Sequence, residues 1–105
     1  MRNFIIGCAL AIALGSLPVW AAGEGKAIYD KSCRACHGPD GKGNPAIAKM
    51  LKVTMQPLGS KEVQAKSDSE LKKIIAEGTG KMKPVSSVSA KQADDVVAFL
   101  RTLKP

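Results

Sequence analysis

The five residues Cys33-Arg34-Ala35-Cys36-His37 constrain this chain more than any other stretch of its sequence. They read C-x-x-C-H, which places two thiols and one imidazole within a single short turn. This spacing is typical of c-type haem attachment, because the two thiols can bond to the two vinyl groups of one porphyrin. The adjacent histidine then lies beneath the iron. We therefore predict that Cys33 and Cys36 hold one covalently bound haem and that His37 ligates its iron.

A C-x-x-C pair has two other common roles. In thioredoxin-like redox proteins it accompanies a βαβ pattern, and no run of strand-like alternation is visible in this chain. A closed zinc site needs four ligands. The only other cysteine is Cys8, in an apolar N-terminal stretch, and His37 is the only histidine. The sequence therefore favours haem attachment over a redox pair or a zinc site.

The first 22 residues have the features of a secretory signal peptide. Arg2 is their only charge, an apolar run follows it, and V-W-A-A places cleavage after Ala21 or Ala22. The alternative is an uncleaved anchor, but the run is shorter than the ~20 residues of a spanning helix. We expect residues 1–22 to be removed, and residues 23–105 to form one exported, periplasmic domain without a stable membrane span.

The charge balance restricts the possible partners. The chain has 16 basic and 9 acidic residues, a net charge of +7, and a basic protein can bind nucleic acid or anionic membranes. No nucleic-acid motif is visible, so we expect no nucleic acid. Two interpretations stay open: the charge steers a monomer toward redox partners with an acidic docking face, or the lysines only keep the surface soluble.

The expected domain has a thin apolar core. Tyr29 and Phe99 are the only aromatic residues after position 22, and a core is marginal at this size without a staple or a cofactor. A large, flat, apolar cofactor would supply the missing buried surface. The size of the core thus agrees with the haem interpretation.

The pattern of the mature chain predicts helices joined by loops rich in Gly, Pro and Ser. We expect helices over about 24–33, 46–52, 68–77 and 90–103. The last two begin with capping boxes at Ser67 and Ser89. The spacing of Ala93, Val96, Val97 and Leu100 predicts one buried helix face. The expected fold class is all-α.

These motifs resemble the class I c-type cytochromes, in particular the small bacterial ones with one haem. The similarity covers Gly25-Lys26-Ala27-Ile28-Tyr29 before the C-x-x-C-H-G sequence, the loop Gly78-Thr79-Gly80-Lys81-Met82-Lys83-Pro84, and the last helix. It implies a cytochrome c-like fold whose N- and C-terminal helices cross, with Gly25 against Phe99. That crossing would explain a helical glycine, which otherwise costs ~1 kcal/mol relative to alanine.

The resemblance also implies that His37 and a methionine are the two axial iron ligands. Met1 leaves with the signal peptide, and Met50 and Met55 lie in the variable middle of the chain. Met82 matches the methionine loop of the family, although Lys83 separates it from the proline that directly follows the methionine in many relatives. We therefore expect Met82 to be the second ligand.

By analogy with the proline after the haem motif in relatives, the Pro45 carbonyl is the expected hydrogen-bond partner of the His37 ring. The alternative is that Pro45 only breaks the loop. Four basic residues flank the motifs and are expected around the exposed haem edge: Arg34, Lys42, Lys81 and Lys83.

The resemblance implies an electron carrier, not an enzyme. One alternative is a fixed subunit of a larger redox complex. Another is a haem enzyme or gas sensor with an open iron position. The second alternative lacks a further histidine for acid–base chemistry, and four-helix relatives with open iron place the haem motif near the C-terminus.

Overall fold

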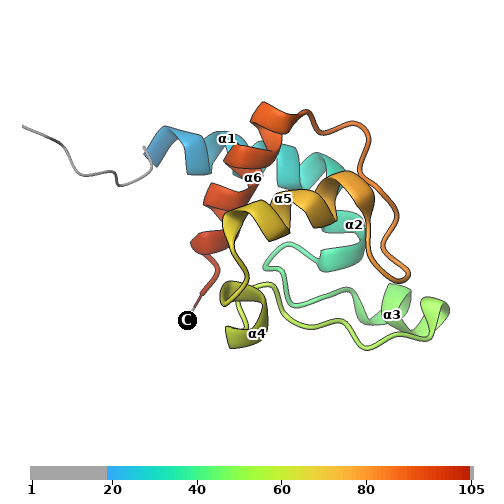
Figure 1. The fold of residues 1–105 in the computed structure, drawn as a ribbon. Helices are drawn as coiled ribbons and strands as arrows, with labels where there is room; N and C mark the ends of the chain where they lie inside the picture. Colours follow the sequence, from blue (N-terminus) through green and yellow to red (C-terminus); the bar gives the residue numbers. More distant parts are fainter. Residues whose placement is uncertain (1–18, 105) are drawn as a thin grey trace, which may run out of the picture.

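The computed structural model describes residues 19–104, and these residues fold into six helices (Figure 1). The helices are α1 (Val19–Ser32), α2 (Arg34–His37), α3 (Pro45–Leu51), α4 (Lys61–Gln64), α5 (Asp68–Glu77) and α6 (Ala90–Arg101). The only β-type pairing in this part of the chain is one isolated bridge between Thr79 and Met82. The expected all-α class is confirmed. Most of the expected signal peptide lies outside the described residues, and its removal stays a prediction.

The two terminal helices cross at Gly25. A Cβ atom on Gly25 would overlap the Asp95 carbonyl of α6 and would lie 3.1 Å from the Cβ of Phe99. One turn further along α1, the Tyr29 ring packs on the Phe99 ring with centroids 5.0 Å apart and planes tilted by 51°. Only a residue without a side chain allows this approach, so the predicted contact of Gly25 with Phe99 is confirmed.

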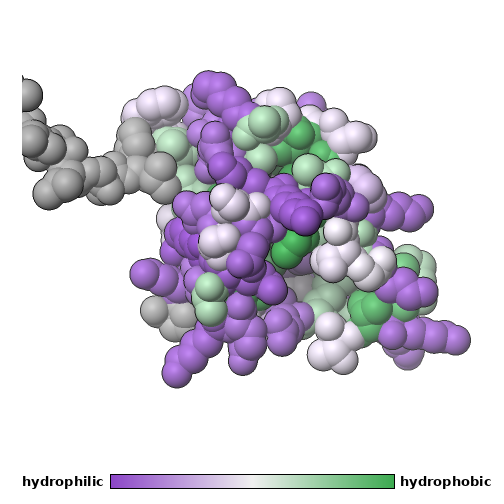
Figure 2. Space-filling view, in the orientation of Figure 1, coloured by the Kyte–Doolittle hydropathy of each residue, from purple (hydrophilic) through white to green (hydrophobic). Residues whose placement is uncertain are grey.

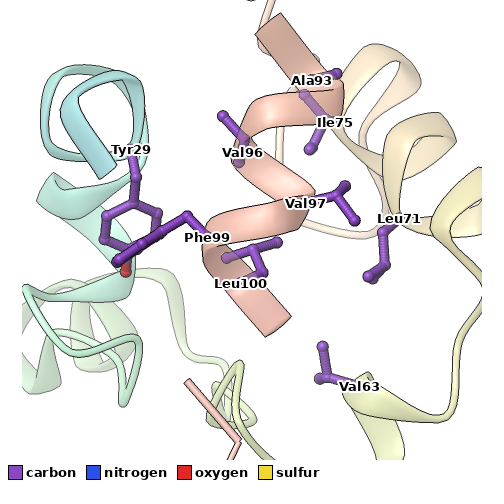
Figure 3. Packing of buried hydrophobic residues seen from close by; sticks show 9 residues of the cluster. All are labelled: Tyr29, Val63, Leu71, Ile75, Ala93, Val96, Val97, Phe99 and Leu100. Atoms are coloured by element: carbon purple, nitrogen blue, oxygen red, sulfur yellow. The ribbon is translucent and has the colours of Figure 1, made fainter. Parts of the chain in front are cut away.

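Helix α6 forms the centre of the core and lies between α1 and α5 (Figure 3). The predicted face of Ala93, Val96, Val97 and Leu100 is buried, and Ala98 and Phe99 are buried beside it. Leu71 and Ile75 of α5 and Val63 of α4 complete the cluster on the other side. Because two helices cover α6, its burial extends beyond one stripe and includes even Asp95, which is 8% exposed.

Helix α3 contrasts with α6 because none of its residues is buried. Met50 is 68% exposed, whereas Ile47 and Leu51 are half-buried. Figure 2 shows hydrophilic side chains over much of this face of the molecule, with apolar surface gathered over α3 and a hollow between α3 and α5. An apolar helix that buries nothing leaves surface available for a further apolar group.

Several helices differ from the expectations. α1 begins at Val19, five residues before the expected Glu24, and includes Gly23 despite the low helix propensity of glycine. α4 was not expected; it begins where the Ser60 hydroxyl accepts from the Val63 N–H at 3.4 Å. α6 ends at Arg101 rather than near Leu103.

The two capping boxes also differ from each other. At the start of α6 both bonds form: Gln92 N–H donates to the Ser89 hydroxyl at 3.2 Å, and Ser89 N–H donates to the Gln92 side chain at 3.0 Å. At the start of α5 the Glu70 N–H donates to the Ser67 hydroxyl at 3.1 Å, but the side chain of Glu70 does not return the bond. The box predicted for α5 is therefore only half formed.

Within residues 19–104, no helix combines the length and the apolar character that a membrane crossing requires.

Candidate haem-binding site

The C-x-x-C-H residues occupy the turn that leads from α1 through α2. The Cys33 N–H donates to the Tyr29 carbonyl at 2.8 Å, which is the last helical contact of α1. The Cys33 carbonyl then accepts from the His37 N–H at 3.0 Å and from the Cys36 N–H at 3.3 Å. These bonds place Cys33, Cys36 and His37 around one turn of backbone, as their spacing predicts.

The two thiols are free in this structure and have different surroundings. Cys33 is half-buried and packs against the core, whereas Cys36 is exposed. Burial raises the pKa of the Cys33 thiol, with a smaller contribution from Cys36. Cys33 therefore stays neutral and suits contact with an apolar group such as a porphyrin.

The His37 ring has the properties of a metal ligand. Its Nδ1 atom is buried and has no hydrogen-bond partner, which is costly for a polar atom. Burial lowers the pKa of the His37 imidazole, and this favours the neutral form that ligates metals. A haem iron fits such a ring, because iron would bind one ring nitrogen and leave the other to donate a hydrogen bond.

The expected hydrogen bond from the His37 ring to the Pro45 carbonyl is not formed here. Pro45 is the first residue of α3, and the carbonyls of a helix point along its axis toward the N–H groups four residues later. The backbone around His37 is instead held by its own loop. The His37 carbonyl accepts from the Gly43 N–H at 2.7 Å, and the Cys36 carbonyl accepts from the Asn44 N–H at 2.9 Å.

The structure places three methionines in different surroundings. Met50 is exposed on α3. Met55 packs over Gly43: a Cβ atom there would lie 3.5 Å from the Met55 sulfur. Met82 is half-buried in a tight, non-helical turn that is closed by two bonds to Thr79, at 2.9 and 3.0 Å. The fourth methionine, Met1, lies outside the described residues.

Two contacts of the haem-motif turn were not found from the sequence. The buried hydroxyl of Tyr29 donates to the Gly38 carbonyl, and the Asn44 side chain donates to the Ala35 carbonyl at 3.1 Å. For Asn44 the signal was present, since asparagine before proline is a helix N-cap pattern and Asn44 does cap α3. For Tyr29 the sequence indicates packing but not a bond partner.

The comparison with known proteins decides between the interpretations of this site. A family model described as "Cytochrome C oxidase, cbb3-type, subunit III" matches residues 21–100. The chain belongs to this family of c-type cytochromes. Cytochrome c-554(547) of Halothiobacillus neapolitanus is 33% identical to it over 91 residues, which are 79% of this chain and 97% of that protein.

A solved structure shows the same fold. The KustC0563 c-type cytochrome superposes with a TM-score of 0.66 at 27% identity, over 77% of this chain and 98% of that one. The cytochrome therefore has a cytochrome c-like fold and carries covalently bound haem c with its iron. The zinc interpretation has no ligand set in residues 19–104, because no three His, Cys, Asp or Glu side chains there are grouped to hold a metal ion.

Proposed function

We propose that this cytochrome is an exported, periplasmic electron carrier whose single haem is attached through Cys33 and Cys36 and whose iron is held by His37 and Met82. The observation that carries the proposal is the turn through α2, which brings together two cysteines that form no disulfide and an imidazole whose buried Nδ1 has no partner. When bound, the haem supplies the one-electron chemistry. Ligation by His and Met favours a higher reduction potential than two histidines would.

The surroundings of the methionines support Met82 as the second ligand. Met50 is exposed to water, where a thioether would not be held at a buried iron. Met55 packs on Gly43, whose N–H binds the His37 carbonyl, so its side chain already contacts the loop that follows His37. Met82 alone stands in a non-helical turn closed by two backbone hydrogen bonds, and the loop around it matches the methionine loop of the family.

The distribution of charge supports a redox partner with an acidic docking face. Two segments, 41–61 and 78–93, contain no acidic residue. Their lysines are all exposed, and none forms an ion pair within residues 19–104: Lys42, Lys49, Lys52, Lys61, Lys81, Lys83 and Lys91. The second segment contains Met82 and the first follows His37. Positive charge on the segments that contain Met82 or follow His37 favours encounter with an acidic partner.

A second candidate is a cytochrome subunit of a larger redox complex. The description of the matching family names an oxidase subunit, which favours this alternative. The chemistry at the iron would be the same, since the complex would only fix the partner in place.

Three measurements on the exported protein test these proposals. Its intact mass should equal the chain without residues 1–22, or 1–21, plus one haem; free thiols or a Cys33–Cys36 disulfide would contradict the attachment.

The reduced protein should not bind carbon monoxide, whereas an open-site enzyme or sensor would. Co-purification with partner subunits would favour the complex over the free carrier.

A further inference from the structure

Tyr29 is the most completely buried side chain of the domain, and its ring and hydroxyl contact different parts of it. The residue is 0% exposed. Its ring packs on Phe99 at the helix crossing, and its hydroxyl donates a hydrogen bond of 2.5 Å to the Gly38 carbonyl. Gly38 directly follows His37. One side chain therefore connects the crossing of α1 and α6 to the backbone beside the proposed iron ligand.

The peptide that follows His37 needs such a connection. Gly38 has φ of +77°, a conformation that L side chains rarely adopt, and it starts the loop to Gly43. The His37 carbonyl is held by the Gly43 N–H at 2.7 Å, and the next carbonyl, that of Gly38, accepts from the Tyr29 hydroxyl and, at 3.4 Å, from the Gly41 N–H. With both carbonyls fixed, rotation of the backbone at His37 is restricted, and so is the direction of its Cα–Cβ bond.

The surroundings of the hydroxyl keep it a donor. Burial raises the pKa of the Tyr29 hydroxyl well above its ordinary value, and the nearby Asp40 and Asp30 add to this. It remains protonated at neutral pH. The Gly38 carbonyl is thus bonded to a neutral, buried O–H group in a fixed direction.

We propose that Tyr29 is a positioning residue for the haem iron: its hydroxyl holds the Gly38 carbonyl, one peptide beyond the His37–Gly38 peptide, and thereby restricts the orientation of the imidazole. This inference rests on the proposed role of His37 as an iron ligand. It makes Tyr29 more than a packing residue, since a phenylalanine at position 29 would pack equally well but would leave the Gly38 carbonyl without this partner.

The test compares two variants of the haem-loaded protein that each lose one hydroxyl-to-carbonyl bond. Tyr29→Phe removes the bond to Gly38. Thr102→Val is the control, because it removes the bond of 2.6 Å from the Thr102 hydroxyl to the Phe99 carbonyl at the far end of α6. The readouts are the iron-shifted proton resonances of the His37 ring in the ferric protein and the reduction potential.

We expect Tyr29→Phe to shift both readouts and Thr102→Val to leave both at wild-type values. If the two variants match wild type in both readouts, Tyr29 is a packing residue only and the inference is wrong. If wild type itself shows no iron-shifted resonance from His37, the proposed ligand is wrong, which is a separate failure.

A second substitution covers the case in which Tyr29→Phe does not fold. Tyr29 is the only tyrosine of the chain, so growth on 3-fluorotyrosine modifies this position alone. The fluorinated hydroxyl is more acidic and donates a stronger hydrogen bond in the same packing. The His37 resonances should then shift in the direction opposite to that of Tyr29→Phe, and unchanged resonances would overturn the inference.

Discussion

At Gly25 the absence of a side chain decides how closely α1 and α6 approach. Any Cβ atom there overlaps the Asp95 carbonyl, which is backbone and cannot move aside as a flexible side chain would. We predict that Gly25→Val lowers the free energy of unfolding by about 1–3 kcal/mol, the usual range for overpacking. Thermal unfolding followed by circular dichroism measures the change.

The matched control for this change is Gly23→Val on the same helix. A Cβ atom at Gly23 meets nothing within 4 Å, so its effect should stay within about 0.5 kcal/mol. Equal losses of stability in the two variants would show that the crossing does not explain the glycine at position 25.

The roles of single residues could be predicted from the sequence where only one residue type fits the chemistry or the available space. The spacing of Cys33, Cys36 and His37 and the helical Gly25 are of this kind. Contacts that depend on exact backbone direction were not predictable. The Tyr29 hydroxyl finds Gly38 because of a loop conformation, and the Pro45 carbonyl is not bonded to the His37 ring because Pro45 starts a helix.

At the scale of elements, the start of α6 depends on a complete capping box. The Ser89 hydroxyl accepts one of the otherwise unpaired N–H groups of the first turn. We predict that Ser89→Ala lowers the free energy of unfolding by about 0.5–2 kcal/mol. For a domain of this size, each kcal/mol corresponds to a fall in Tm of roughly 4–8 °C.

Ser86→Ala is the control for the cap, since Ser86 is exposed and forms no hydrogen bond among the described residues. Its melting midpoint should match wild type. A Ser89→Ala variant as stable as Ser86→Ala would mean that packing against α1 and α5 alone determines where α6 begins.

Helices with a strong hydrophobic pattern could be predicted from the sequence. Short helices, and helices without such a pattern, could not. The stripe of α6 and the serine before it predict both its existence and its buried face. α4 has only four residues and one buried side chain, Val63, too few to produce a periodic signal. α1 begins before the expected Glu24 because the helix continues through Gly23, whose low helix propensity does not end it.

At the scale of the whole molecule, we expect the core to depend on the haem. The core cluster contains two aromatic side chains, and α3 carries apolar residues but no buried one, so apolar surface is left for a haem to cover. We predict that a Cys33→Ala, Cys36→Ala double variant made without haem has little helical circular dichroism. A cooperative thermal transition in that variant would show that the core is sufficient alone.

The central claim is that Met82 and His37 together hold the iron, and the charge-transfer band between methionine sulfur and ferric iron tests it most directly. Met82→Ala should abolish this band, open the reduced iron to carbon monoxide and lower the reduction potential, because a thioether ligand favours ferrous iron. Met50→Leu and Met55→Leu should retain the band and remain closed to carbon monoxide. A band that survives Met82→Ala and disappears with Met50→Leu or Met55→Leu would contradict the account.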